Sequence, residues 1–173
     1  HLLRRQRQMC IRDRVRCFES DKITHVNSKI NPLDDLETIK TEIILSDLDI
    51  VQKKLEKGKK KLLEEKEIKI LEDKLKQLND GKEVIAKDKE EAKFITTSGL
   101  LSIKPKIIVC NVDEESLAKG NTFTENVKKN YSREKVVTIC ADIEDQIMGL
   151  DNNERETFMR EIGLNKTGLN QLI

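Results

Sequence analysis

Two stretches with heptad spacing, lying between the only two prolines (Pro32 and Pro105), constrain the fold most strongly. In each stretch the heptad positions form a seam, which is a narrow apolar stripe along a highly charged helix. Such a stripe is buried only when the helix packs against a partner. We therefore predict an antiparallel coiled-coil helical hairpin inserted over residues 34–93, with a turn near residues 58–63. The first seam is Ile44, Leu48, Val51, Leu55 and Leu62, and the second is Ile68, Leu71, Leu75 and Leu78.

The ends of the hairpin carry helix signals. Asn31 can cap the first helix, and Pro32 suits its first position. Asn79 to Gly81 would end the second helix. A helix over residues 34–62 would be about 40 Å long at 1.5 Å per residue, so the hairpin should project from a globular body.

Charge is unevenly spread along the hairpin. Residues 34–52 hold six acids against one lysine, whereas residues 53–61 hold six lysines against one glutamate. Such runs are usually solvated, salt-bridged surfaces. The functional alternative is a tip that contacts phosphates, with binding that weakens as salt rises. The candidate RNA contacts are Lys57, Lys59, Lys60 and Lys61.

The rest of the chain alternates strands and helices. Residues 106–110 and 135–140 are β-branched runs typical of buried strands in a parallel sheet, and each is followed by a helical pattern. This order predicts an α/β fold. The short apolar runs 15–18 and 23–26 suggest further strand ends.

Both predicted strands end in polar or small residues. The first is followed by Asn111, Val112, Asp113 and Glu114, and the second ends at Cys140 and is followed by Ala141. Ligands of open parallel sheets bind beyond the carboxyl ends of strands, where a GTPase places its two base-reading loops. Taken alone the signal is weak, because Asn and Asp commonly end strands as turn formers.

Several stretches resemble the YchF branch of the Obg-related P-loop ATPases. They are residues 15–26 (VRCFESDKITHV), 30–39 (INPLDDLETI), 41–49 (TEIILSDLD), 104–112 (KPKIIVCNV) and 154–164 (ERETFMREIGL). The resemblance implies a Ras-like P-loop domain interrupted by a coiled-coil hairpin and followed by a TGS domain. It also implies slow hydrolysis of ATP, with Mg²⁺, and association with the ribosome or ribosomal RNA. The nucleotide-binding domain would then comprise residues 15–33 and 94–173.

The resemblance assigns base-reading roles. Val112 stands at the lysine position of the GTPase motif and Glu114 at its aspartate position. An aspartate accepts hydrogen bonds from N1 and N2 of guanine, and the longer Glu114 cannot hold that geometry. Asn111 can pair with the N6 and N7 edge of adenine. Val112 would contact the base, and the backbone of Cys140 and Ala141 would close its other side.

The sequence contains no G-x-x-x-x-G-K-[ST] motif, so no phosphate cradle and no catalytic residue are assigned. We expect the chain to be a piece of an ATPase that lacks the P-loop and TGS parts and does not hydrolyse ATP by itself. Residues 1–14 match nothing in the family and look non-native. The alternative function is a non-enzymatic coiled-coil module that binds RNA or protein.

Composition excludes several classes. The net charge of +1 gives no global attraction to DNA or membranes. No apolar run approaches the roughly 20 residues of a membrane span, so we expect a soluble cytoplasmic protein. The four cysteines form no C-x-x-C pair, which argues against a metal site. Redox sensing through Cys110 and Cys140 is a third, weaker hypothesis.

Overall fold

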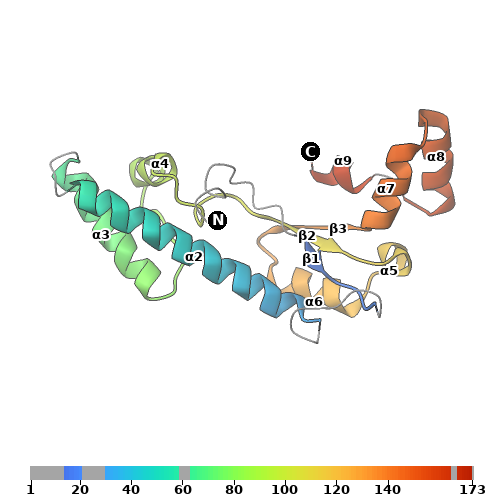
Figure 1. Cartoon of the computed structure of the whole chain (residues 1–173), viewed down its shortest axis with the longest axis horizontal. Coiled ribbons are helices and arrows are strands. Elements are labelled where there is room, and N and C mark those ends of the chain that lie inside the picture. Colours follow the sequence, from blue (N-terminus) through green and yellow to red (C-terminus); the bar gives the residue numbers. More distant parts are fainter. Residues whose placement is uncertain (1–13, 21–29, 59–62, 165–166, 173) are drawn as a thin grey trace. The chain divides into compact units, whose positions relative to one another are not determined.

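The structure is a computed structural model that describes residues 14–20, 30–58, 63–164 and 167–172 (Figure 1). The chain divides into two compact units, one of His1–Leu33 with Lys106–Ile173 and one of Asp34–Pro105. The second unit therefore runs past residue 93, where the sequence placed the end of the inserted hairpin. Of the segment 1–14, only Arg14 is among the described residues, and the run 23–26 lies outside them.

The first unit contains a three-stranded parallel sheet in the order β1-β2-β3. The strands are β1 (Val15–Arg16), β2 (Ile107–Asn111) and β3 (Lys135–Ile139). Val15 pairs with Cys110 and Ile107 pairs with Lys135. The α/β class is confirmed, with both predicted strands in place. The helices are α5 (Glu114–Lys119), α6 (Thr122–Asn130), α7 (Ala141–Gly149), α8 (Asn152–Glu161) and α9 (Gly168–Leu172).

Side-chain caps fix where three of these helices begin. The carboxylate of Asp113 accepts from the Ser116 N–H at 2.8 Å, at the start of α5. Asn121 caps α6 and Asp151 caps α8, each within a reciprocal capping box. Such caps satisfy N–H groups that have no partner inside the helix. Each helix can therefore start soon after the preceding strand or helix.

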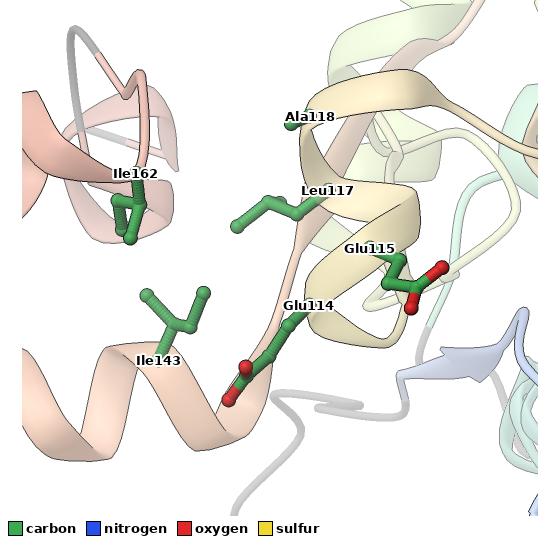
Figure 2. Close-up of a pocket in the computed structure, with 6 residues that line it drawn as sticks. All are labelled: Glu114, Glu115, Leu117, Ala118, Ile143 and Ile162. Carbon is green, nitrogen blue, oxygen red and sulfur yellow. The ribbon is translucent and has the colours of Figure 1, made fainter.

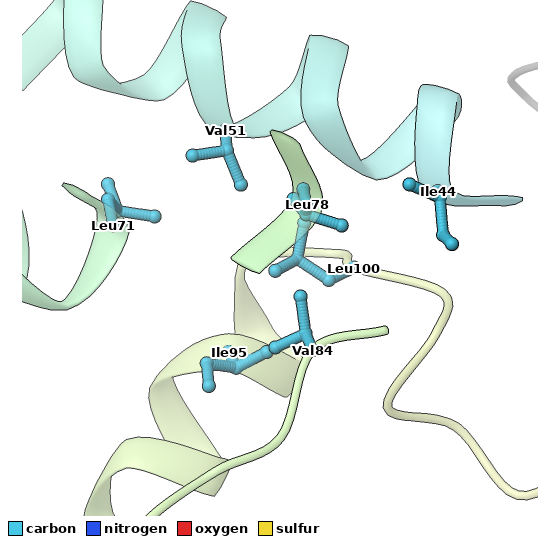
Figure 3. Packing of buried hydrophobic residues seen from close by; sticks show 7 residues of the cluster. All are labelled: Ile44, Val51, Leu71, Leu78, Val84, Ile95 and Leu100. Atoms are coloured by element: carbon cyan, nitrogen blue, oxygen red, sulfur yellow. The ribbon is translucent and has the colours of Figure 1, made fainter. Parts of the chain in front are cut away.

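The second unit contains α2 (Pro32–Lys57) from Asp34 onward, α3 (Glu65–Asn79) and α4 (Lys89–Thr97). The two heptad stretches form α2 and α3, and α3 ends at Asn79 as predicted. α2 ends at Lys57, five residues before the predicted end at Leu62. The shared core of the unit is made by Ile44, Val51, Leu71, Leu78, Val84, Ile95 and Leu100 (Figure 3).

Three of those core residues lie outside the two heptad seams. Val84 follows α3, Ile95 belongs to α4, and Leu100 comes after α4. Their side chains are 4%, 0% and 0% exposed. The seams therefore pack against α4 and its flanking loops as well as against each other, and the sequence periodicity of α2 and α3 did not reveal this third contribution.

Two buried polar clusters accompany that core. Asp47, fully buried in α2, accepts hydrogen bonds from Leu101 N–H at 2.7 Å and Ser102 N–H at 2.9 Å. Lys74 of α3 is also fully buried, forms an ion pair with Glu91 of α4, and donates to the Ile85 carbonyl at 2.8 Å. Asp47 and Lys74 are thus structural groups rather than parts of a solvated charge run.

Candidate functional site

The carboxyl ends of β2 and β3 lie next to each other. Asn111, the last residue of β2, pairs in register with Ile139, the last residue of β3. The Val112 N–H donates to the Ile139 carbonyl at 2.9 Å, which extends the pairing by one residue. α5 and α7 begin within three residues of these strand ends. The two loops that the sequence singled out therefore meet at one edge of the sheet, as parallel topology requires.

The Asn111 side chain joins the two loops. Its amide oxygen accepts a hydrogen bond from the Ala141 N–H at 3.0 Å. Ala141 is the first residue of α7, so this bond also satisfies one of the N–H groups at the helix start. Within the described part of the chain, the amide NH2 of Asn111 has no hydrogen-bond partner. This NH2 is a donor held in a fixed position by the bond on the other atom of the same amide.

The other candidate residues differ in how much they expose. Glu114 is exposed at the start of α5, and Ala141 is half-buried. Val112 and Cys140 are only 2% and 1% exposed, so their side chains belong to the core in this structure. Among the candidate residues, the polar side chains that are not buried at this edge are therefore those of Asn111 and Glu114.

Neighbouring residues that the sequence did not single out support this edge. The Asn121 amide donates to the Cys17 carbonyl at 2.6 Å and accepts from the Thr124 N–H at 2.9 Å. The Cys17 N–H donates to the Asn111 carbonyl at 2.8 Å. These bonds tie the end of β1 to β2 and to α6. A side-chain bond spanning 104 residues leaves no local sequence signal.

An apolar pocket of about 270 Å³ adjoins Glu114 (Figure 2). Leu117 of α5, Ile143 of α7 and Ile162 after α8 point toward the same space. Its lining is Glu114, Glu115, Leu117, Ala118, Ile143 and Ile162.

Three cysteines among the described residues are buried and form no disulfide: Cys17, Cys110 and Cys140. A hydrogen bond with the Cys17 thiol lowers the pKa of Cys110, and burial opposes that shift. The thiol of Cys110 is thus hydrogen-bonded to Cys17, which directly follows β1, whereas the redox hypothesis named Cys140 as its partner. No group of three metal-binding side chains lies within the described residues.

Of the candidate RNA-contact residues, Lys57 is exposed and ends α2. Lys59, Lys60 and Lys61 lie outside the described residues. Lys53, one turn before Lys57, donates to Asp49 at 2.5 Å. No helix in the described parts of the chain has the length and apolar character of a membrane span.

Known proteins resemble this chain over most of its length. It is 39% identical over 170 residues to the ribosome-binding ATPase YchF of Escherichia coli O157:H7, covering 92% of the chain and 46% of the relative. The proteins of the same name from Bacillus subtilis strain 168 and Mycoplasma genitalium are 33% and 36% identical, over 92% of the chain and 46% and 47% of the relatives. The chain thus spans about half the length of these curated relatives.

One solved structure shares the fold. The Schizosaccharomyces pombe YchF GTPase superposes with a TM-score of 0.76 at 22% identity, over 91% of this chain and 46% of that protein. At that identity the likeness concerns the fold alone. No family model matches the sequence.

Proposed function

Because this chain belongs to the YchF family of Obg-related ATPases, we propose that it contributes the adenine-recognition half of an ATP site together with a coiled-coil arm. The observation that carries the proposal is the bond between the Asn111 amide oxygen and the Ala141 N–H at 3.0 Å. That bond fixes the orientation of the amide, whose NH2 has no hydrogen-bond partner within the described residues. An oriented donor beyond two parallel strands is what a base-reading site needs.

Adenine fits the polar groups at this edge. It presents an acceptor at N7 and a donor at N6. The Asn111 NH2 donates to N7, and the exposed Glu114 carboxylate is the nearby acceptor for an N–H group of the base. Val112 and Cys140 position the site indirectly, because their buried side chains hold the two loops in place. The half-buried Ala141 closes the site beside the base.

The proposal assigns the phosphates and the metal ion to residues other than those of the adenine-recognition half. The sequence has no G-x-x-x-x-G-K-[ST] motif, and no metal-binding cluster lies in the described parts of the chain. The triphosphate and Mg²⁺ would thus be held by other parts of the complete protein, whose fold we propose to be Ras-like.

The complete protein is, in this proposal, a cytoplasmic ATPase associated with the ribosome. Support comes from the relatives, which carry the name ribosome-binding ATPase. The arm would be the antiparallel pair α2 and α3, with its lysine-rich end from Lys57 to Lys61 facing ribosomal RNA. Phosphate contacts of this kind weaken as salt rises.

A second candidate is a non-enzymatic module that binds RNA or protein. It is favoured by the second unit, which has its own apolar core and its own buried polar contacts. Salt-sensitive RNA binding that is lost on replacing Lys59, Lys60 and Lys61 by glutamine, with no response to nucleotide, would support it over the first proposal.

The test is binding of ATP and GTP to the full chain by isothermal titration calorimetry. We expect weak binding that prefers ATP and is abolished by Asn111→Ala. The control Asn126→Ala, on the exposed face of α6, should bind as the unchanged chain does. Equal binding of ATP and GTP, or an unchanged affinity in Asn111→Ala, would overturn the proposal. Hydrolysis should not exceed that of a no-protein control.

A further inference from the structure

We propose that the pocket between α5, α7 and the end of α8 docks a basic peptide segment of a protein partner through one bulky apolar side chain. The pocket presents Leu117, Ile143 and Ile162 to a common space, with the Glu114 carboxylate beside it (Figure 2). This inference does not depend on nucleotide binding.

The size of the pocket favours a side chain over a small molecule. Its volume is about 270 Å³. Pockets for drug-sized ligands span roughly 300–1,000 Å³ and carry several convergent polar groups. The polar groups here are two glutamates on one side, and the remaining lining is aliphatic. An apolar anchor residue that fills a small pocket is the usual centre of a protein interface.

The pocket is supported from behind by a packed cluster. Ile143 is 5% exposed and packs with Cys140 and Ile147, against which Leu117 and Ile162 also lie. A wall built on buried residues is preformed, so little side-chain ordering opposes binding.

Charge determines which partner fits. The helices α5, α7 and α8 and their capping residues are strongly acidic. They comprise residues 113–119 and 141–161, which hold ten acidic residues and three basic ones. One of the basic residues, Arg160, already bridges to Glu156 at 3.7 Å. Glu115, which contributes to the lining, is exposed and adds to this negative charge. This field repels nucleic acid and attracts a positively charged segment. The partner is therefore a basic peptide and not RNA.

The test is fluorescence anisotropy of the full chain with a short fluorescein-labelled peptide of lysines and arginines around one central leucine. Ala118→Arg places bulk and positive charge at the pocket from an exposed helix position. We expect it to weaken binding about tenfold or more, as loss of an interface anchor does. Asn126→Arg, which adds the same charge on α6, is the matched control and should bind normally. Glu115→Lys should also weaken binding, whereas Glu125→Lys on α6 should not.

Two further probes separate the sources of affinity. A peptide with alanine in place of leucine should bind about tenfold more weakly, and a peptide of glutamates around leucine should not bind. The proposal is overturned if no basic peptide binds, if Ala118→Arg and Asn126→Arg behave alike, or if an RNA oligonucleotide competes at the site sensitive to Ala118→Arg. Calorimetry with ATP on the same samples reports separately on the proposed function.

Discussion

The carboxylate of Asp47 accepts a hydrogen bond from the hydroxyl of Ser102 at 2.6 Å, across 55 positions of sequence. The same carboxylate accepts the Leu101 and Ser102 N–H groups. Ser102 in turn accepts from the Val84 N–H at 3.3 Å. The buried Asp47 thereby connects α2 to the segments that precede and follow α4, and these bonds hold the second unit together.

Asp47→Ala should strongly destabilise the second unit. The substitution leaves two backbone N–H groups and a hydroxyl buried without their acceptor, and bonds to a charged group contribute about 1.5–3 kcal/mol each. We expect a loss of about 3 kcal/mol or more in the free energy of unfolding, measured by urea denaturation. Asp49→Ala is the control: its partly exposed pair with Lys53 should contribute less than about 1 kcal/mol. Equal losses in the two variants would contradict this role for Asp47.

Lys74→Met should cost about 3–5 kcal/mol in urea denaturation, because it leaves Glu91 as a buried charge without its cation. The double variant Lys74→Met/Glu91→Leu should lose much less, since neither charge then remains in the core. A double-mutant cycle measures the coupling. Single losses that simply add in the double variant would show that the buried pair is not coupled.

Gly168→Ala should release α9 from the sheet. A Cβ at this position would lie 2.3 Å from Ile139 Cγ2 and 2.9 Å from Glu144 Oε1, whereas the Gly168 N–H now donates to that same oxygen. We expect faster amide hydrogen exchange in residues 168–172 and a stability loss of about 1–3 kcal/mol. Gly149→Ala is the matched control, because a Cβ there meets nothing within 4 Å. It should be neutral or slightly stabilising.

Lys87→Met should raise the pKa of Asp73. A side-chain hydrogen bond from Lys87, followed by its charge, lowers the pKa of Asp73 below the ordinary value of 3.8. A lowered folded-state pKa stabilises the fold above the unfolded-state pKa, and this contribution is lost as pH falls through the folded-state value. Carboxyl-carbon chemical shifts between neutral and acid pH would measure the change. Lys76→Met, an exposed change on the same helix as Asp73, should leave the titration of Asp73 where it was.

Sequence periodicity predicted α2 and α3 of the second unit, because a heptad stripe needs a partner surface whatever that surface is. It did not determine the partner. α4 and Leu100 complete the core. No pattern in the sequence of α2 predicts the hydrogen bond between Asp47 and Ser102. Asp47 and Lys74 look like ordinary surface charges in the sequence. Whether these side chains are buried depends on the segments that pack against them, and only the tertiary structure brings those segments together.

The strand ends show the same division. By itself the sequence predicted that Asn111 and Ala141 lie at the ends of two β-branched strands, and parallel pairing then brought their loops together. Only the tertiary structure decided that the Asn111 oxygen accepts from Ala141 while Val112 and Cys140 are buried. Local propensity acts between neighbours in the chain. Which hydrogen bonds a side chain forms and whether it is buried depend on contacts between segments that are distant in the sequence and that exclude water where they pack.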